Sequence, residues 1–219
     1  RIFDGRRRYN LHFTPAGEDT LPPTRYGAYA GPALKCLVRY EPIGGGCLIP
    51  ADLDDDGWTD LVVCGWVLVD ADAFLRVFHN DHGHFVDITD RVRGDDLQVQ
   101  DAAVADMDGD GSLDLALMGT FATRVVIQQP DGTFDVAWQE RIPGGRDLAA
   151  GDADGDGDPD LYVARAVGKA DQPDAILLND GTGSRYGWLD TPATLRGGVA
   201  GTVVGGRAVY VNDVSGLRL

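Results

Sequence analysis

The chain has few of the residues and runs on which several common functions depend. Its 219 residues include only four histidines, three cysteines and two methionines. It has no run of eighteen apolar residues, so we expect no segment that inserts into a membrane. The glycine runs at 44–46 and 205–206 are not followed by the Lys-Ser/Thr pair of a phosphate-binding loop. A formal net charge of −16 without a basic stripe also argues against a nucleic-acid partner.

Aspartate is abundant, and it is arranged with a fixed spacing. Of the 35 acidic residues, 32 are aspartate, and 14 of these lie in three segments that share the pattern D-x-D-x-D-G-x-x-D. The segments begin at Asp52, Asp106 and Asp152, which are 54 and 46 residues apart. Carboxylates at positions 1, 3, 5 and 9 can surround a hard divalent cation, and glycine at position 6 permits the tight turn. The pattern predicts three Ca²⁺ sites within an internal repeat.

The residues around each loop predict strands rather than helices. A helical EF-hand loop needs a bidentate glutamate at position 12, where this chain has Val63, Leu117 and Val163. Short apolar runs precede and follow each loop, as expected for buried strands. Each loop is therefore predicted to be a calcium-bound turn between two antiparallel strands.

A second hairpin follows each loop at a similar distance. Segments 77–85, 126–134 and 177–186 each combine an apolar strand, an Asn/Asp–Gly turn and an aromatic residue that opens the next strand. One unit thus contains four antiparallel strands in just under fifty residues, which describes a propeller blade. The predicted fold class is all-β, a β-propeller of about four blades.

The unit resembles the FG-GAP/VCBS repeat of integrin α-chain propellers and of many secreted bacterial and fungal proteins. The resemblance covers residues 42–193 and implies that Ca²⁺ stiffens the loop between the first two strands of three blades. Position 7 would contribute its backbone carbonyl, as in the analogous helical calcium loop. The implied metal ligands are Asp52, Asp54, Asp56, Trp58 and Asp60; Asp106, Asp108, Asp110, Ser112 and Asp114; and Asp152, Asp154, Asp156, Asp158 and Asp160.

The repeat divides the chain into blades and two less regular ends. The predicted blades span 42–93, 94–143 and 144–193, and 194–219 form a degenerate or partial fourth blade. Residues 1–41 do not match the repeat and are predicted to form β-strands. Two arrangements stay open. Either these strands complete the last blade and close a ring, which avoids open sheet edges, or they form a separate piece beside an open run of blades.

The cysteines and histidines allow two interpretations each. Cys36, Cys47 and Cys64 are an odd number, and Cys47 and Cys64 flank the first loop almost symmetrically. They are either a cross-strand pair or small buried apolar residues, and we favour burial. The group His79, His82 and His84 has a spacing that can hold a transition metal, but it also falls in the hairpin turn of the first blade, and we favour the turn.

Three tryptophans bear on recognition. Trp58 lies inside the first loop and is the best candidate for an exposed ligand contact, because its backbone would serve the metal while its side chain is free. Trp138 and Trp188 hold related positions after the hairpin turn, and we expect both to pack between blades.

These features favour a calcium-stabilised extracellular, cell-surface or periplasmic module that binds a protein or glycan. Three bound Ca²⁺ ions would change the formal charge from −16 to −10. Because we expect the paired carboxylates to bind calcium, we predict no catalytic residues. The alternatives are a propeller enzyme, a lyase or hydrolase acting on polysaccharide, and a structural scaffold of a secreted assembly. A homo-oligomer is compatible with each of them.

Overall fold

The computed structural model describes residues 46–67, 72–93, 97–165 and 173–189, and the strands 198–203, 208–212 and 216–218. These residues form an all-β structure, in which a 3-10 turn at Thr89–Arg91 is the one helical element within the described ranges. None of the described helices has the length and apolar character needed to cross a membrane. The predictions for residues 1–41 and for Cys36 lie outside the described residues.

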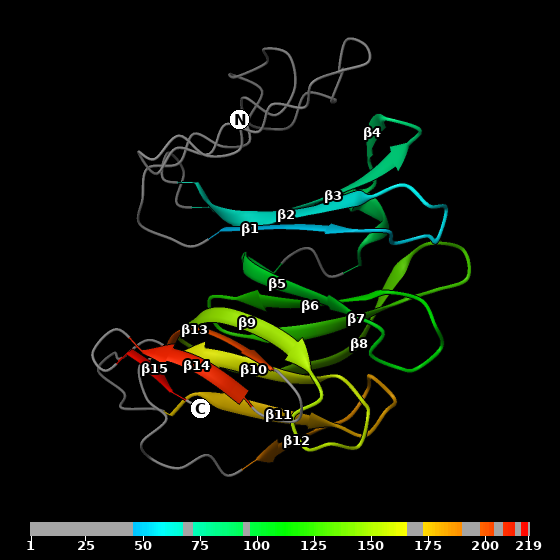
Figure 1. The fold of residues 1–219 in the computed structure, drawn as a ribbon. Coiled ribbons are helices and arrows are strands. Elements are labelled where there is room, and N and C mark those ends of the chain that lie inside the picture. The colour runs from blue at the N-terminus through cyan, green and yellow to red at the C-terminus, as the bar shows by residue number, and fades with distance from the viewer. Residues whose placement is uncertain are drawn as a thin grey trace.

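Three four-stranded antiparallel sheets follow one another along the chain (Figure 1). In each sheet the strands are hydrogen-bonded in chain order. The first sheet contains β1 (Gly46–Ala51), β2 (Asp60–Val67), β3 (Asp72–Asp81) and β4 (His84–Asp87). The second contains β5 (Val99–Ala105), β6 (Asp114–Gly119), β7 (Thr123–Gln128) and β8 (Phe134–Glu140). The third contains β9 (Gly145–Gly151), β10 (Asp160–Arg165), β11 (Ala175–Asn179) and β12 (Tyr186–Leu189).

A fourth, three-stranded sheet follows the third. It contains β13 (Gly198–Val203), β14 (Ala208–Asn212) and β15 (Gly216–Arg218), again antiparallel and in chain order. Strand β13 lies beside β9 and β10. The fourth sheet therefore adds to the third in the same way as the third adds to the second.

The sheets stack face to face, and their first strands are neighbours. Strand β5 packs against β1 and β2, and β9 packs against β5 and β6. Figure 1 shows the first sheet above the second and the second above the third, whereas the fourth sheet overlaps the third in this view. The all-β class and the four-stranded antiparallel units predicted from the sequence are confirmed.

Apolar side chains between successive sheets form the core. The layer between the first and second sheets contains Val62, Val77 and Leu117, and the layer between the second and third contains Met118, Val125 and Leu161, all fully or almost fully buried. Strands β6 and β10 are buried along their whole length, in agreement with the apolar runs 115–118 and 161–164 that follow their first aspartate. Burial of each such side chain contributes about 1.5–3 kcal/mol relative to exposure.

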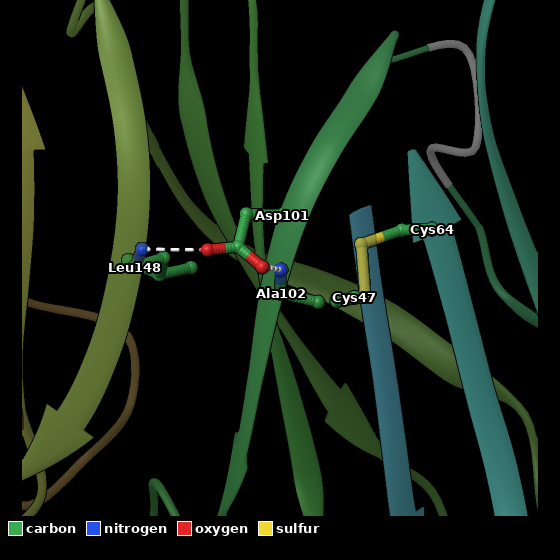
Figure 2. Close-up of a disulfide and its surroundings, with 5 residues drawn as sticks. All are labelled: Cys47, Cys64, Asp101, Ala102 and Leu148. Atoms are coloured by element: carbon green, nitrogen blue, oxygen red, sulfur yellow. Dashed lines mark hydrogen bonds between the residues drawn. A yellow bond between two sulfur atoms is a disulfide. The ribbon is translucent and has the colours of Figure 1, made fainter. Parts of the chain in front are cut away.

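A disulfide joins the first two strands. Cys47 and Cys64 pair directly across β1 and β2, with their Cα atoms 4.9 Å apart, and the two residues are bonded (Figure 2). The expectation that these cysteines are merely buried as apolar residues was wrong. The loop between β1 and β2 leaves the register of the two strands unbroken, so Ala51, just before the loop, pairs with Asp60 at its end.

Candidate metal centres

Each aspartate-rich segment is the connection between the first and second strands of its sheet. The ninth position is the first residue of the second strand, and it pairs with the last residue of the first strand: Ala51 with Asp60, Ala105 with Asp114 and Gly151 with Asp160. Loop 1 (52–60), loop 2 (106–114) and loop 3 (152–160) are thus three copies of one hairpin connection. Within the described residues no α-helix flanks a loop, so an EF-hand is ruled out.

Left-handed backbone at positions 4 and 6 turns each loop. Position 6 is glycine in all three loops, with φ of 86° at Gly57, 96° at Gly111 and 101° at Gly157. Such φ values are strained for residues with a Cβ atom. At position 4, loops 2 and 3 also have glycine, whereas loop 1 has Asp55 at φ 57°.

The ninth aspartate holds the loop closed from inside the protein. In loop 2, Asp114 accepts a hydrogen bond at Oδ2 from the Met107 N–H (2.8 Å) and at Oδ1 from the Gln128 N–H (2.8 Å). Loops 1 and 3 repeat both bonds with the equivalent residues. All three ninth aspartates are buried. Because each carboxylate oxygen has a second lone pair, these bonds leave capacity for a metal.

Loops 2 and 3 each bring three carboxylates to one point. The acidic side chains of positions 1, 3 and 9 offer oxygen atoms that lie within 4.8 Å of one another. The residues are Asp106, Asp108 and Asp114 in loop 2, and Asp152, Asp154 and Asp160 in loop 3. An all-oxygen donor set is the type that Ca²⁺ prefers.

The fifth and seventh positions take other roles in the described structure. The carboxylate of position 5 accepts a hydrogen bond from the N–H of position 7: Asp56 from Trp58 (2.7 Å), Asp110 from Ser112 (2.7 Å) and Asp156 from Asp158 (3.0 Å). This bond turns the backbone at position 7, whose carbonyl is the predicted ligand. The Asp158 carboxylate lies against Gly181 in the next hairpin turn.

Loop 1 differs from the other two. Its carboxylates form two overlapping groups that share Asp54, one with Asp52 and Asp56 and one with Asp60 and His79. The His79 Nδ1 atom lies 3.1 Å from Asp54 Oδ2 and 3.3 Å from Asp60 Oδ1. Sequence analysis did not connect His79 with the loop.

Burial makes the negative form of several loop carboxylates unfavourable. It raises the pKa of Asp114 to about 6, with the nearby Asp108 and Asp110 charges acting in the same direction. Burial is also the main cause of the raised pKa of Asp54, Asp108 and Asp160. A bound cation would offset both the desolvation and the mutual repulsion.

The three histidines of the first hairpin do not gather into a metal group of their own. His79 lies on β3 beside loop 1, whereas the exposed His82 has its Nδ1 atom 2.9 Å from Asp81 Oδ1 in the turn. His84 begins β4 and is exposed. The spacing that suggested one cluster therefore separates into one strand residue and two turn residues.

Two of the tryptophan predictions agree with the structure and one does not. The Trp58 side chain is 40% exposed, and its ring lies 5.3 Å from that of His82. Trp138 packs in the core layer between the second and third sheets, with its ring 4.7 Å from that of Tyr186. Trp188, on β12, was expected to pack in the same way, but it is 51% exposed.

The fold and the loops define a β-repeat protein with an acidic loop between the first two strands of each of three units. Residues 52–117 match the family model of the FG-GAP-like repeat. The match runs from the first aspartate of loop 1 into β6, and it confirms the resemblance for that part of the chain. No curated protein matches the chain.

Proposed function

We propose that the chain is a calcium-stabilised β-propeller module that binds a protein or a glycan. The observation that supports this most directly is that equivalent carboxylates converge in loops 2 and 3, above a ninth aspartate fixed by two main-chain N–H groups. In loops 2 and 3, positions 1, 3 and 9 would hold Ca²⁺, with the position 7 carbonyl and position 5 close by. In loop 1, Asp52, Asp54, Asp56 and Asp60 are the equivalent oxygen donors.

The stacking of the sheets supports a propeller. Adjacent first strands, β1 to β5 to β9 to β13, are the arrangement that blades have around a central axis. Closure of the ring, by residues 1–41 or by a second chain, is part of the proposal. Molar mass from light scattering separates the two routes, because closure by a second chain requires a homo-oligomer, whereas a monomer leaves only closure within one chain.

The proposed binding surface includes Trp58. Its exposed ring lies beside His82 at the loop 1 edge of the first sheet, and exposed tryptophan is favoured where proteins bind sugars or other proteins. The Cys47–Cys64 disulfide supports an extracellular or periplasmic setting, where such bonds persist.

Calcium titration tests the metal part of the proposal. Calorimetry is expected to find about three Ca²⁺ ions per chain, and Asp108→Ala is expected to remove one of them. Asp90→Ala, on the 3-10 turn, is the control and should keep all three. Identical thermal melting in EDTA and in excess Ca²⁺ would contradict the proposal.

A glycan array with and without Ca²⁺ tests the recognition part. We expect binding that needs Ca²⁺ and that falls in Trp58→Ala. Trp188→Ala changes a somewhat more exposed tryptophan on the third sheet and should bind as wild type. Equal loss in both variants would argue against Trp58 as the contact.

A further inference from the structure

We propose that loop 1 is a mixed nitrogen–oxygen site that prefers a transition-metal dication, Zn²⁺ in the first place, with His79 Nδ1 as a ligand. This deepens the proposed function, since it takes the three loops to be metal sites and separates loop 1 from the other two by the metal that it selects.

The register of β2 and β3 places His79 beside loop 1. Leu61 pairs with Phe78 across β2 and β3, so His79 is the next residue toward the loop and lies opposite Asp60. In the second sheet Leu115 pairs with Val126, and in the third Leu161 pairs with Leu177. The equivalent positions are therefore Ile127 and Leu178, which have no donor atom in their side chains. Loop 1 alone among the three has an imidazole there.

The distances suit a shared metal. His79 Nδ1 lies 3.1 Å from Asp54 Oδ2 and 3.3 Å from Asp60 Oδ1. Bonds of about 2.0–2.1 Å place neighbouring donors about 2.8–3.0 Å apart in octahedral and about 3.3–3.4 Å apart in tetrahedral coordination. The two distances from His79 Nδ1 are thus those of neighbouring ligands around one ion of that size, and the two carboxylates offer oxygen atoms within 4.8 Å of each other.

The donor atoms also select the metal. Imidazole nitrogen suits zinc and its transition-metal neighbours, whereas all-carboxylate sets suit calcium and magnesium. In loops 2 and 3 the converging acidic groups contain carboxylates only. In loop 1 the group around Asp60 replaces the first-position aspartate by His79.

The site has one buried and fixed ligand, and its other two ligands are open to solvent. Asp60 has a side chain that is 2% exposed, and it is held by the N–H groups of Leu53 and Asn80. The Asp54 and His79 side chains are 45% and 26% exposed, so an ion can reach the site from solvent. Two half-exposed donors over one buried and fixed donor can close on an ion with little movement of the backbone.

Competition between the two metals tests the proposal. Zn²⁺ is titrated by calorimetry into the protein in saturating Ca²⁺, and the wild type is expected to bind one Zn²⁺ per chain. His79→Leu, which copies the third sheet, is expected to weaken this binding at least tenfold. The control His82→Leu alters the same hairpin outside the group and should bind Zn²⁺ as wild type.

¹⁵N-histidine NMR of the wild type tests directly whether His79 is a metal ligand. Saturation with Zn²⁺ should shift the Nδ1 resonance of His79, and this measurement does not depend on a variant folding. If no metal binds, the Nδ1–H group of His79 simply hydrogen-bonds to the two carboxylates, and its resonance stays unshifted on addition of Zn²⁺. An unshifted resonance, no Zn²⁺ uptake against Ca²⁺, or equal affinity in His79→Leu would each overturn the proposal.

The same samples separate this inference from the proposed function. Calcium binding by loops 2 and 3 is measured before Zn²⁺ is added, in wild type and in His79→Leu. If those loops take no Ca²⁺, the calcium proposal fails regardless of zinc. If they take Ca²⁺ and zinc does not depend on His79, only the present inference fails.

Discussion

The ninth aspartate of each loop connects the candidate metal centre to the main chain. In loop 2, Asp114 is fully buried and accepts one N–H at each carboxylate oxygen, from Met107 before the turn and from Gln128 on the next hairpin. The fifth aspartate of the same loop, Asp110, is exposed and bonds only the local Ser112 N–H. We therefore expect the two acids to stabilise different states, the ninth the fold itself and the fifth the loop with its proposed metal bound.

Asp114→Ala should destabilise the protein even without metal. It leaves two buried N–H groups without their carboxylate, which costs about 2–5 kcal/mol of unfolding free energy. Urea unfolding in EDTA measures this. Asp110→Ala is the matched control, with little effect in EDTA and a clear loss of stability in Ca²⁺. Equal effects of the two substitutions in EDTA would contradict the division of roles.

A half-buried carboxylate lies between the second and third sheets. Asp101 on β5 accepts at Oδ2 from the Leu148 N–H of β9 (2.8 Å), and at Oδ1 from the Ala102 N–H (3.0 Å) (Figure 2). Burial, assisted by Asp147, raises its pKa to about 7. Unfolded, the carboxyl would titrate near its ordinary value of about 3.9. Between these values the folded state keeps a proton that the unfolded chain loses, so this group lowers stability as pH rises toward 7.

Asp101→Asn should flatten that pH dependence. The amide keeps one oxygen acceptor but carries no charge. Between pH 5 and pH 8 the free energy of unfolding of the wild type should therefore fall by about 1–3 kcal/mol relative to that of the variant. Urea midpoints at both pH values, in EDTA, measure the gain. Asp147→Asn should give a smaller change in the same direction. Parallel pH profiles of wild type and Asp101→Asn would show that the carboxyl ionises normally in the fold.

At the scale of elements, loops 1 and 2 are each held by the sheet that follows them. The Gln128 side-chain amide, at the end of β7, donates to the Leu113 carbonyl of its own loop (2.9 Å) and to the Leu53 carbonyl of loop 1 (2.7 Å). Asn179, at the end of β11, likewise donates to the Pro159 carbonyl and to the Met107 carbonyl of loop 2. The second residue of a loop is thus bonded through its carbonyl to the next unit.

Gln128→Ala should loosen loop 1 from the second sheet. It removes donors to two carbonyls, for an expected loss of about 1–3 kcal/mol. Denaturation measures the total, and amide exchange around residues 52–60 should show the loosening locally. Gln129→Ala, whose amide bonds only the nearby Ile127 carbonyl, is the control. Unchanged exchange in loop 1 would mean that apolar packing alone holds the two sheets together.

Local sequence determined the elements but not these connections. The loops, the flanking strands and the hairpin turns follow from glycine, aspartate and apolar residues at fixed spacing, so they could be predicted. The approach of Gln128 to Leu53 joins residues 75 apart, and no local pattern marks it. His79 reached loop 1 through the register of β2 and β3, which depends on the length of the intervening connection. Asp101 follows Gln98 and Gln100 in the sequence, so nothing local marks it as a contact between sheets, and only the packing of β9 shows that it lies there.

At the scale of the whole molecule, repulsion among the loop aspartates opposes folding. The formal charge of −16 includes 14 aspartates in three short loops, which repel one another most strongly when no cation is bound. Three Ca²⁺ ions would reduce the formal charge to −10 and would place the positive charge where the repulsion is greatest. Salt screens exposed charges, with a Debye length that shortens from about 30 Å at 0.01 M to about 10 Å at 0.1 M. Salt and calcium therefore relieve the same repulsion by different means.

The stability of the calcium-free protein should consequently depend on salt more than that of the calcium-bound protein. In EDTA, raising NaCl from about 20 mM to about 300 mM should raise the melting temperature by several degrees, whereas in excess Ca²⁺ the rise should be smaller. Choline chloride in place of NaCl controls for Na⁺ binding in the loops. The combined substitution of Asp56, Asp110 and Asp156 by asparagine removes one exposed charge per loop, so it should reduce the salt dependence in EDTA. Equal salt slopes with and without Ca²⁺ would show that loop repulsion does not limit stability, and calcium would then stabilise the fold only by cross-linking each loop.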